Sequence, residues 1–313
     1  MEIRQLRHFL ALMETRSYWR AAQACELTPQ ALSKSIRRFE EDLGVRLFDR
    51  DTRSVKPTLF ADEIATYARN IDAEATSLGR ALDALLGAGT NRLVIGTGAA
   101  AATKLVGEAL LAVLEQRPRL AANVIEGTYE SLAPQLLNGK LDIVVSIMTI
   151  DSVDRLIEHR VLHQEHYRVY ARAGHPLAFR RTVPLAQLLE YRWIAGDDQD
   201  LVAEEIAASF AAAGLAPPRP ALRTNSVSFA TGVLLQSDAL FILPTEMMRR
   251  EVESGLIVAL DTDSGAWTRP TAVFFRKNST RSPDSLLFLK ELKRIIERLD
   301  TRQPVVAYKD YGL

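Results

Sequence analysis

Residues 28–50 of this 313-residue chain read TPQALSKSIRRFEEDLGVRLFDR, and this stretch decides the fold of the N-terminal region. Thr28 is a good N-terminal cap for a helix, Pro29 fits the first helical position, and Gly44 is a typical C-terminal stop. The apolar face of the predicted helix carries Leu32, Ile36, Phe39 and Leu43. The opposite, polar face carries Gln30, Ser33, Lys34, Arg37 and Glu41. We therefore expect a helix that buries one side and offers hydrogen-bonding and cationic groups on the other.

The neighbouring residues predict a compact helical unit with a basic ribbon. Apolar residues at helical spacing between positions 3 and 13 predict a first helix, and the alanine-rich residues 18–25 predict a second. Apolar residues on both sides of the polar turn at 50–54 predict two short strands, whose cations are Arg50, Arg53 and Lys56. A helix-turn-helix beside a basic ribbon suits DNA, whereas a charged helix face by itself is usually only solvated.

These segments resemble a known DNA-binding domain. RAAQ at 20–23, TPQALSKSIRRFEEDLGVRLFDR and the following Pro-Thr are similar to the winged helix-turn-helix of the LysR-type transcriptional regulators. The resemblance implies that the third helix enters the major groove and the wing grips phosphates. The residues expected at DNA are Thr28, Gln30, Ser33, Lys34, Arg37, Arg38, Arg50, Arg53 and Lys56. The sequence departs from the family at Arg16, where glycine is common, and in PTLFADE, which lacks a frequent glycine.

The next segment, residues 58–86, has a heptad pattern. Apolar residues alternate at spacings of four and three, at Ile64, Ala68, Ile71, Ala75, Leu78, Leu82 and Leu85. This pattern is typical of a coiled-coil seam, and a helix of about 40 Å, at 1.5 Å per residue, is too long to bury in one small domain. We expect it to pair with a second copy; the alternative is a single helix lying on the next domain. In LysR-type regulators the corresponding helix links the domains and forms the dimer.

Composition limits the chemistry of the chain. The 39 basic and 39 acidic residues cancel, so affinity for nucleic acid must come from a local patch. A single cysteine, Cys25, excludes an internal disulfide and fits a reducing cytoplasm, where we expect the protein to act. The sequence shows neither an export signal nor an apolar run long enough to span a membrane.

After residue 91, strands alternate with helices, which predicts an α/β fold with a parallel sheet. The first strand and turn, LVIGTGAAAAT at 93–103, contain a GxGxxA pattern at Gly96, Gly98 and Ala101. A lone pattern of this kind is weak evidence for a dinucleotide, and no nicotinamide chemistry accompanies it. We favour a small-ligand pocket and expect no cofactor. Its residues from this half are Thr97, Gly98, Ala99, Ala100, Thr103, Thr128, Tyr129, Ser146 and Ile147.

The remainder predicts a second lobe and a return to the first. EGTYESLAPQLLNGKLDIVVS (126–146) and GHPLA (174–178) resemble the effector domain of LysR-type regulators, whose fold is that of periplasmic binding proteins. The resemblance implies two lobes joined by two crossing strands, with the inducer between them. The second lobe is expected to contribute Gly196, Asn225 and Ser226 to the pocket.

Two other candidates are weaker. His159, His163 and His166 contain an HxxH pattern, but strand residues three apart point to opposite faces, so we expect no metal site. Cys25 lies in an alanine-rich helix, where a small buried thiol is the usual interpretation and a redox role the alternative. The sequence has no HExxH or similar catalytic signature, so we expect no enzyme activity.

The sequence thus predicts three parts and a tail. These are a winged helix-turn-helix (1–58), a linker helix (59–90), an effector domain (91–300; lobe I 91–163 and 268–300, lobe II 164–267) and a C-terminal tail (301–313). The expected partners are double-stranded DNA, a small organic or aromatic acid, further copies of the chain as a homodimer or homotetramer, and RNA polymerase. The rivals are a nicotinamide enzyme and a small-molecule binding protein that does not bind DNA.

Overall fold

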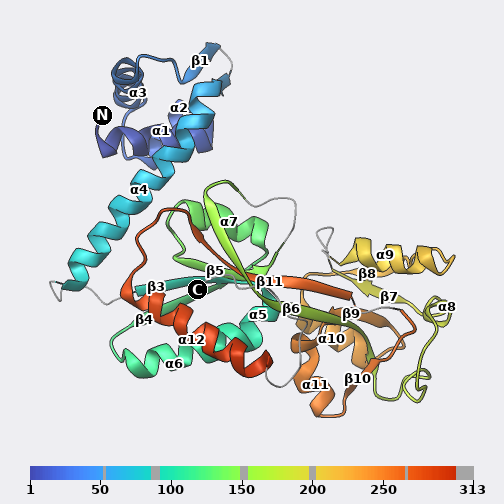
Figure 1. Ribbon diagram of the computed structural model, residues 1–313. Helices are drawn as coiled ribbons and strands as arrows, with labels where there is room; N and C mark the ends of the chain where they lie inside the picture. Colours follow the sequence, from blue (N-terminus) through green and yellow to red (C-terminus); the bar gives the residue numbers. More distant parts are fainter. Residues whose placement is uncertain (52–53, 86–91, 149–153, 197–201, 265–266, 301–313) are drawn as a thin grey trace.

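The structure is a computed structural model, which describes residues 1–51, 54–85, 92–148, 154–196, 202–264 and 267–300. Its N-terminal domain is a winged helix-turn-helix (Figure 1), with α1 (Ile3–Thr15), α2 (Tyr18–Ala24), α3 (Pro29–Leu43), β1 (Phe48–Asp51) and β2 (Ser54–Pro57). The predicted end signals of α3 are confirmed: the Thr28 hydroxyl accepts the Ala31 N–H at 3.2 Å, and Gly44 ends the helix at φ 70°. The rings of Phe39 and Phe48 lie 5.7 and 5.8 Å from Phe9 and close the core.

The linker helix α4 (Leu59–Leu85) runs from this domain past the effector domain (Figure 1). Its first turns pack on α1, and Ala61, Ala65 and Ala68 belong to the core of the winged domain. Further along, Ala73 lies so close to Gly139 of the effector domain that a Cβ on this glycine would lie 2.8 Å from the Cβ of Ala73. The helix therefore contacts both domains of its own chain.

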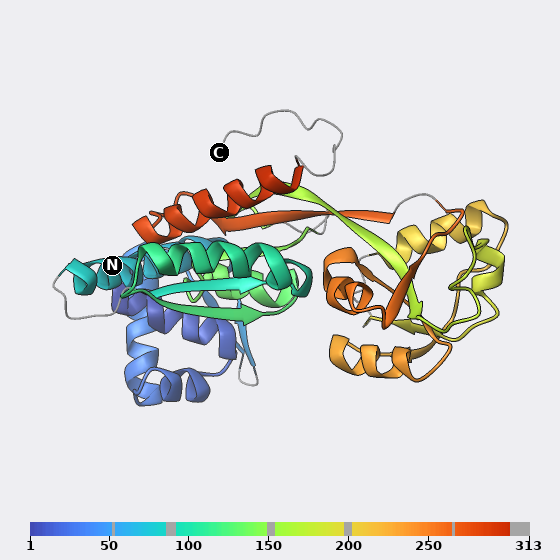
Figure 2. The same cartoon turned by 90° about the horizontal axis from the view of Figure 1, so that it is seen from below.

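The first lobe is a three-layer unit (Figure 2). Its parallel strands are β3 (Arg92–Thr97), β4 (Ala121–Glu126) and β5 (Ile143–Ile147). One face is covered by η1, a π-helix (Ala102–Val106), α6 (Gly107–Gln116) and α12 (Pro283–Asp300), and the other by α7 (Tyr129–Leu137). A short helix, α5 (Ala99–Ala101), connects β3 to η1. The alternation of strands and helices expected from the sequence is confirmed here.

The second lobe surrounds a smaller set of strands. Its strands are β7 (Trp193–Ala195), β8 (Pro220–Arg223), β9 (Leu240–Pro244) and β10 (Ile257–Leu260), and its helices are α8 (Leu185–Leu188), α9 (Ala203–Ala212), α10 (Val227–Leu235), η2 (Thr245–Met248) and α11 (Arg249–Glu253). Asn225, expected at the end of a strand, lies beyond β8 in the connection to α10. Two buried clusters fill this lobe, one on each side of its sheet.

Two long strands join the lobes, β6 (Ile157–Arg172) and β11 (Trp267–Arg276), as Figure 2 shows. They are antiparallel to each other, and β11 also pairs with β5 in an antiparallel sense. The expected parallel arrangement of β3, β4 and β5 is confirmed, and β6 and β11 extend it in an antiparallel sense. One mixed sheet in the order β4-β3-β5-β11-β6-β9-β7-β8 runs through both lobes. The register of β6 and β11 shifts between Thr271 and Ala272, opposite His163 and Val161, near the expected lobe boundary.

The strand directions place the two sets of carboxyl ends opposite each other. Because β11 runs from lobe II to lobe I, its antiparallel partner β5, with β3 and β4, points toward lobe II. Because β6 runs the other way, β9, with β7 and β8, points back toward lobe I.

Among the described residues, no helix is both long enough and apolar enough to cross a membrane.

Candidate DNA-binding face and effector site

The outer face of α3 carries the polar residues that the sequence predicts at DNA. Gln30, Lys34, Arg37 and Arg38 are exposed and Ser33 is half-buried. Thr28 is exposed, but its hydroxyl caps the helix. The apolar face is fixed in the core, where Leu32, Ile36 and Phe39 are at most 1% exposed. The helix therefore presents amide, hydroxyl and cationic groups without exposing its apolar side.

The wing is held against α3 by one carboxylate. The Glu40 Oε1 accepts the backbone N–H groups of Leu47 and Phe48 at 2.8 and 3.2 Å, at the start of β1. The predicted ribbon is confirmed, because β1 and β2 pair in an antiparallel sense with Asp49 opposite Lys56. Lys56 is exposed. Arg50 lies on β1, opposite Val55, and Arg53 lies outside the described residues.

The linker helix exposes an apolar stripe on its outer side. Its members recur at spacings of seven and four residues and share one helical face: Phe60, Tyr67, Ile71, Leu78 and Leu82, which are 57, 60, 39, 71 and 53% exposed. Of the predicted seam, Ile71, Leu78 and Leu82 belong to this stripe and Ala75 is half-buried. Ala68 is 1% exposed inside the winged domain, and Ile64 packs against that core. Phe60 and Tyr67, which the heptad count missed, continue the stripe toward the DNA-binding domain.

The predicted effector residues lie at the opposed strand ends, but they differ in accessibility. In lobe I, Thr97, Tyr129 and Ser146 are buried, Ala100 is 5% exposed, and Gly98, Ala99 and Ile147 are half-buried. Thr103 and Thr128 are exposed, and the Thr103 hydroxyl donates to the Ala99 carbonyl at 3.0 Å. In lobe II, Gly196 is half-buried, while Asn225 and Ser226 are exposed. Ile147 packs against the core of lobe II and so forms a direct contact between the lobes.

The GxGxxA pattern is explained by packing within lobe I. A Cβ on Gly96 would lie 2.8 Å from Leu141 Cδ1, and one on Gly98 would lie 2.8 Å from the Ser146 hydroxyl. Both glycines thus leave space for neighbouring side chains of the same lobe. This packing accounts for both glycines without a dinucleotide.

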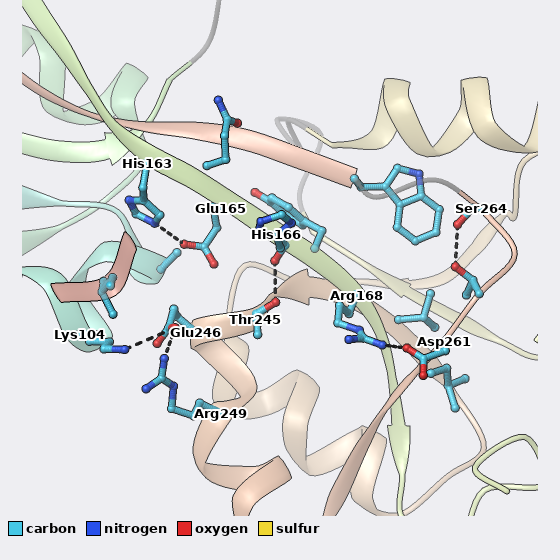
Figure 3. Close-up of a pocket in the computed structure, with 18 of the residues that line it drawn as sticks. Lys104, His163, Glu165, His166, Arg168, Thr245, Glu246, Arg249, Asp261 and Ser264 are labelled. Atoms are coloured by element: carbon cyan, nitrogen blue, oxygen red, sulfur yellow. Dashed lines mark hydrogen bonds and ion pairs between the residues drawn. The ribbon is translucent and has the colours of Figure 1, made fainter. Parts of the chain in front are cut away.

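A cavity of about 660 Å³ lies between the lobes beneath β6, as Figure 3 shows. Lobe I contributes Ala100 and Lys104, β6 contributes residues 163–169, and lobe II contributes Thr245, Glu246 and Arg249. Of the predicted effector residues, only Ala100 lines this cavity. The sequence analysis missed its charged residues, because a lone lysine, arginine or glutamate on a helix is typical of a solvated face. The π-helical turn that contains Lys104 is the local feature that marks it, since such turns are frequent at functional sites.

Ion pairs at both ends and a histidine–carboxylate contact between them divide the cavity into three regions. At one end, Lys104 and Arg249 both contact Glu246 Oε1, with a Lys104 Nζ distance of 3.8 Å. In the middle, His163 Nε2 lies 3.2 Å from Glu165, a carboxylate that is only 4% exposed. At the other end, Arg168 is bonded to Asp261 (Figure 3). The Lys104–Glu246 pair joins η1 of lobe I to η2 of lobe II.

The other sequence candidates do not form sites in the part of the chain that the structure describes. No group of three or more metal-binding side chains lies together there: His163 pairs with Glu165, and the His159 ring lies 6.0 Å from Phe274. Cys25 is half-buried, and burial raises the pKa of its thiol, which lowers its reactivity.

Two family models together match nearly all the described chain. Residues 3–62 match the bacterial regulatory helix-turn-helix of the lysR family, and residues 87–296 match the LysR substrate binding domain. The chain belongs to the LysR family of transcriptional regulators. The resemblance seen in the sequence, the two-lobed fold and the regulatory class are thereby confirmed. The family consists of regulators and not of enzymes.

Relatives and solved structures agree with this assignment. The chain is 28% identical over 307 residues to an SDS degradation transcriptional activation protein of a Pseudomonas species, covering 97% of this chain and 98% of the relative. It is 26% identical over 295 residues to the regulator GbpR of Azospirillum brasilense, covering 94% and 86%. Full-length OxyR of Pseudomonas aeruginosa superposes with a TM-score of 0.60 at 18% identity, covering 95% of both chains. CbnR in complex with its target DNA superposes with a TM-score of 0.54 at 22% identity, covering 95% of this chain and 100% of CbnR.

Proposed function

We propose that this LysR-type regulator binds one class of operator DNA and changes its DNA binding when a small molecule occupies the space between its two lobes. The observation that supports this proposal is the opposition of the two sets of strand ends across β6 and β11. A ligand in that space touches both lobes, and its affinity then depends on the angle between them. Chromosomal DNA is the target, and the protein therefore acts in the cytoplasm.

The roles at DNA follow from side-chain chemistry. Gln30 and Ser33 lie near the N-terminus of α3, where side chains of a recognition helix reach base edges. Amide and hydroxyl groups read the donor and acceptor pattern of bases, whereas arginine and lysine contact phosphates. The phosphate contacts are Lys34, Arg37 and Arg38 from the helix and Arg50, Arg53 and Lys56 from the wing. Thr28 stays the helix cap and brings the first free N–H groups of α3 to the backbone.

Pairing of α4 between two chains gives the regulator two DNA-binding heads. The stripe from Phe60 to Leu82 is a connected apolar surface on a single helix, and such a surface is stable in water only when it is covered. Two dimers assemble into a tetramer on an extended operator. RNA polymerase is the further partner, because a regulator bound beside a promoter acts by contact with the polymerase.

The effector is a small organic or aromatic acid. The N-terminus of α7 faces the inter-lobe space through Thr128, whose hydroxyl makes no capping bond, and helix N-termini favour anions. Thr128 from lobe I and Asn225 from lobe II are among the exposed polar residues that we assign to this space. We assign the strand-end positions from Thr97 to Ser226 to this pocket.

Thermal unfolding of the full-length protein tests this function first. A panel of organic, aromatic and sugar acids, with NAD and NADP, is screened for stabilisation, which reaches about 2.7 kcal/mol at a ligand concentration of a hundred times Kd. DNA affinity is then measured at fixed salt with and without each stabilising compound, on fragments that the protein itself selects from genomic DNA. An acid that stabilises the protein and changes its DNA affinity supports the proposal. Stabilisation by NAD or NADP alone, or the absence of any DNA selection, contradicts it.

A further inference from the structure

A pocket of about 270 Å³ lies where the winged domain, the linker helix and lobe I meet, and we call it the junction pocket. Helix α4 runs past α7 there (Figure 1). The charged and amide side chains of the pocket come from α1, α4 and the turn after α7, and they are Arg7, Glu14, Arg69, Asp72, Asn138 and Lys140. Among the described residues, the junction pocket shares none with the cavity between the lobes or with the strand-end positions assigned to the effector.

Two cations of the junction pocket have no partner in the part of the chain that the structure describes. Arg7 Nε lies 2.6 Å from Asp72 Oδ1, so these two charges neutralise each other. Arg69 on α4 and Lys140 after α7 form neither a side-chain hydrogen bond nor an ion pair with a described residue. Two like charges that face one pocket repel each other, and an anion that touches both replaces this repulsion with attraction.

The other lining residues indicate what the anion is attached to. The Glu14 carboxylate accepts hydrogen bonds and the Asn138 amide both donates and accepts them, so both groups suit hydroxyls. Leu10, Ala11 and Ala24 offer apolar contacts to a short carbon chain. The volume is slightly below the usual range of sites for drug-sized ligands, about 300–1,000 Å³, so the ligand is a small one.

We propose that the junction pocket binds a small phosphate monoester that carries hydroxyl groups, a class represented by glycerol phosphate. The phosphate contacts Arg69 and Lys140 through charge-assisted hydrogen bonds, and a hydroxyl donates to Glu14. The pocket is complete only while the winged domain lies against lobe I, since Glu14 belongs to the first and Lys140 to the second. The ligand therefore stabilises this arrangement of the two domains. Its effect on DNA binding rests on the function proposed above, but ligand binding does not.

Calorimetric titration of the full-length protein without DNA tests the ligand class. The probes are glycerol phosphate, inorganic phosphate, glycerol, and malate, which is a dicarboxylate with a hydroxyl. Glycerol phosphate is expected to bind most tightly, and inorganic phosphate less tightly because it has no polyol hydroxyl to donate to Glu14. Glycerol is expected not to bind measurably, because it lacks the charge. If glycerol phosphate does not bind in the millimolar range, or binds no more tightly than malate, the proposal is overturned.

Two variants and two controls locate the binding. Arg69→Gln and Lys140→Met each remove one cation, and each is expected to weaken the binding of glycerol phosphate by about tenfold to a hundredfold, the usual effect of losing a charged hydrogen bond. Arg4→Gln and Lys277→Met are the matched controls, because both residues are exposed and neither lines the junction pocket. Both controls are expected to bind as the unchanged protein does. Thermal unfolding without ligand identifies a variant that fails to fold, and the other cation variant then decides.

Cys25 provides a local measure of occupancy. It lines the junction pocket and is the only cysteine of the chain, so the rate of thiol alkylation reports on this pocket alone. Glycerol phosphate is expected to slow the alkylation about tenfold at roughly ten times its Kd, because the thiol reacts only in the unoccupied fraction. Binding that calorimetry detects while Cys25 reacts at an unchanged rate lies elsewhere on the protein and overturns the proposal.

The pattern of losses separates the junction pocket from the DNA-binding face and from the proposed function. Binding of glycerol phosphate that is lost in Arg37→Ala but kept in Arg69→Gln lies on the DNA-binding face, which overturns the junction pocket and leaves the proposed function intact. Binding that requires Arg69 and Lys140 but leaves DNA affinity unchanged supports the pocket and contradicts its effect on DNA binding. Binding by a protein that selects no DNA supports the pocket and contradicts the proposed function alone.

Discussion

Glu74 on the linker helix lies beside Arg276 at the end of β11, with 3.7 Å between Glu74 Oε1 and Arg276 Nη2. Arg276 is only 5% exposed and donates to the carbonyl oxygens of Leu136 and Leu141 at 3.1 and 3.3 Å. The second oxygen of Glu74 accepts the backbone N–H of Thr280 at 3.4 Å. β11 is one of the two strands that join the lobes. A change in the angle between the lobes is therefore transmitted to α4 through the contact of Arg276 with Glu74.

Replacing Glu74 is therefore expected to uncouple the two functions. Glu74→Gln keeps the shape of the side chain and removes its charge, so the effector is expected to bind with unchanged Kd while its effect on DNA affinity falls by at least half. Coupling free energies in allosteric proteins are typically about 1–3 kcal/mol, within reach of affinity measurements with and without effector. Glu63→Gln, an exposed position on the same helix, is the control. If the effector changes the DNA affinity of Glu74→Gln as much as that of the unchanged protein, the coupling does not depend on the Glu74–Arg276 contact.

The DNA-binding face predicts two kinds of loss. Arg37→Ala is expected to weaken binding to all sequences and to reduce the salt dependence of log K by about one phosphate contact. Gln30→Ala is expected to cost about 1–3 kcal/mol of discrimination at one base pair with an unchanged salt dependence. Fluorescence anisotropy over a salt series, on the operator and its single-base variants, measures both. Arg192→Ala, at an exposed position in lobe II, is the control. If Arg37→Ala binds DNA as this control does, Arg37 is not part of the DNA interface.

The exposed stripe on α4 predicts the effect of a charge on assembly. Leu78→Asp places a carboxylate in the middle of the stripe, where burying a leucine contributes about 1.5–3 kcal/mol. Because a symmetric dimer contains the substitution twice, the dimer Kd is expected to rise by about a hundredfold or more. Sedimentation over a concentration series measures it. Thr76→Asp, on the opposite side of the helix, is expected to leave the dimer intact; equal dissociation in both variants contradicts the stripe as the interface.

Helix α4 shows what the heptad pattern of the sequence predicts and what it does not. Heptad counting predicted the length of α4 and its partly apolar face, and Ile71, Leu78 and Leu82 lie on the exposed stripe. It also selected Ala68, which is buried in the winged domain, and missed Tyr67. A pattern of apolar residues does not distinguish a helix face that packs within its own domain from a face that pairs with another chain. Only the position of the neighbouring helix α1 shows which face of α4 is buried.

The two crossing strands were expected from the family resemblance, but the charged cavity beside them could not be predicted from local sequence patterns. Lys104, Glu246 and Arg249 come together only because β6 and β11 join the lobes, and such a contact between distant segments leaves no local pattern. The histidine segment was placed on or beside a strand, but the start of β6 at Ile157 was not predicted, since the side chains between residues 158 and 164 are mixed in polarity and mostly half-buried. By contrast, Thr28 and Gly44 were recognised because helix caps depend on local chemistry alone.

Arg16 explains one departure from the family pattern and predicts a stabilising change. It ends α1 in the left-handed region, at φ 52° and ψ 26°, which costs a side-chain-bearing residue roughly 1–2 kcal/mol. Arg16→Gly removes this strain but gains unfolded-state entropy, so a net stabilisation of about 0.5–1 kcal/mol is expected for the winged domain. Arg20→Gly, inside α2, is the matched control and is expected to destabilise by about 1 kcal/mol. Denaturant unfolding compares the two, and a destabilised Arg16→Gly protein contradicts the argument.

His8 predicts how the winged domain responds to acid. The side chain is buried between α1 and α3, with Nδ1 2.7 Å from the Ser35 hydroxyl, and burial, with the Arg4 charge, lowers its pKa below the usual 6.5. As pH falls below about 6.5, the unfolded chain takes up a proton that the folded domain resists, so stability decreases until the pH reaches the lowered pKa. His8→Gln removes this titration while keeping a polar side chain. Urea unfolding followed through the N-terminal Trp19 is expected to lose stability more steeply below pH 6.5 in the unchanged protein than in the variant. Identical slopes mean that His8 does not set the acid sensitivity of this domain.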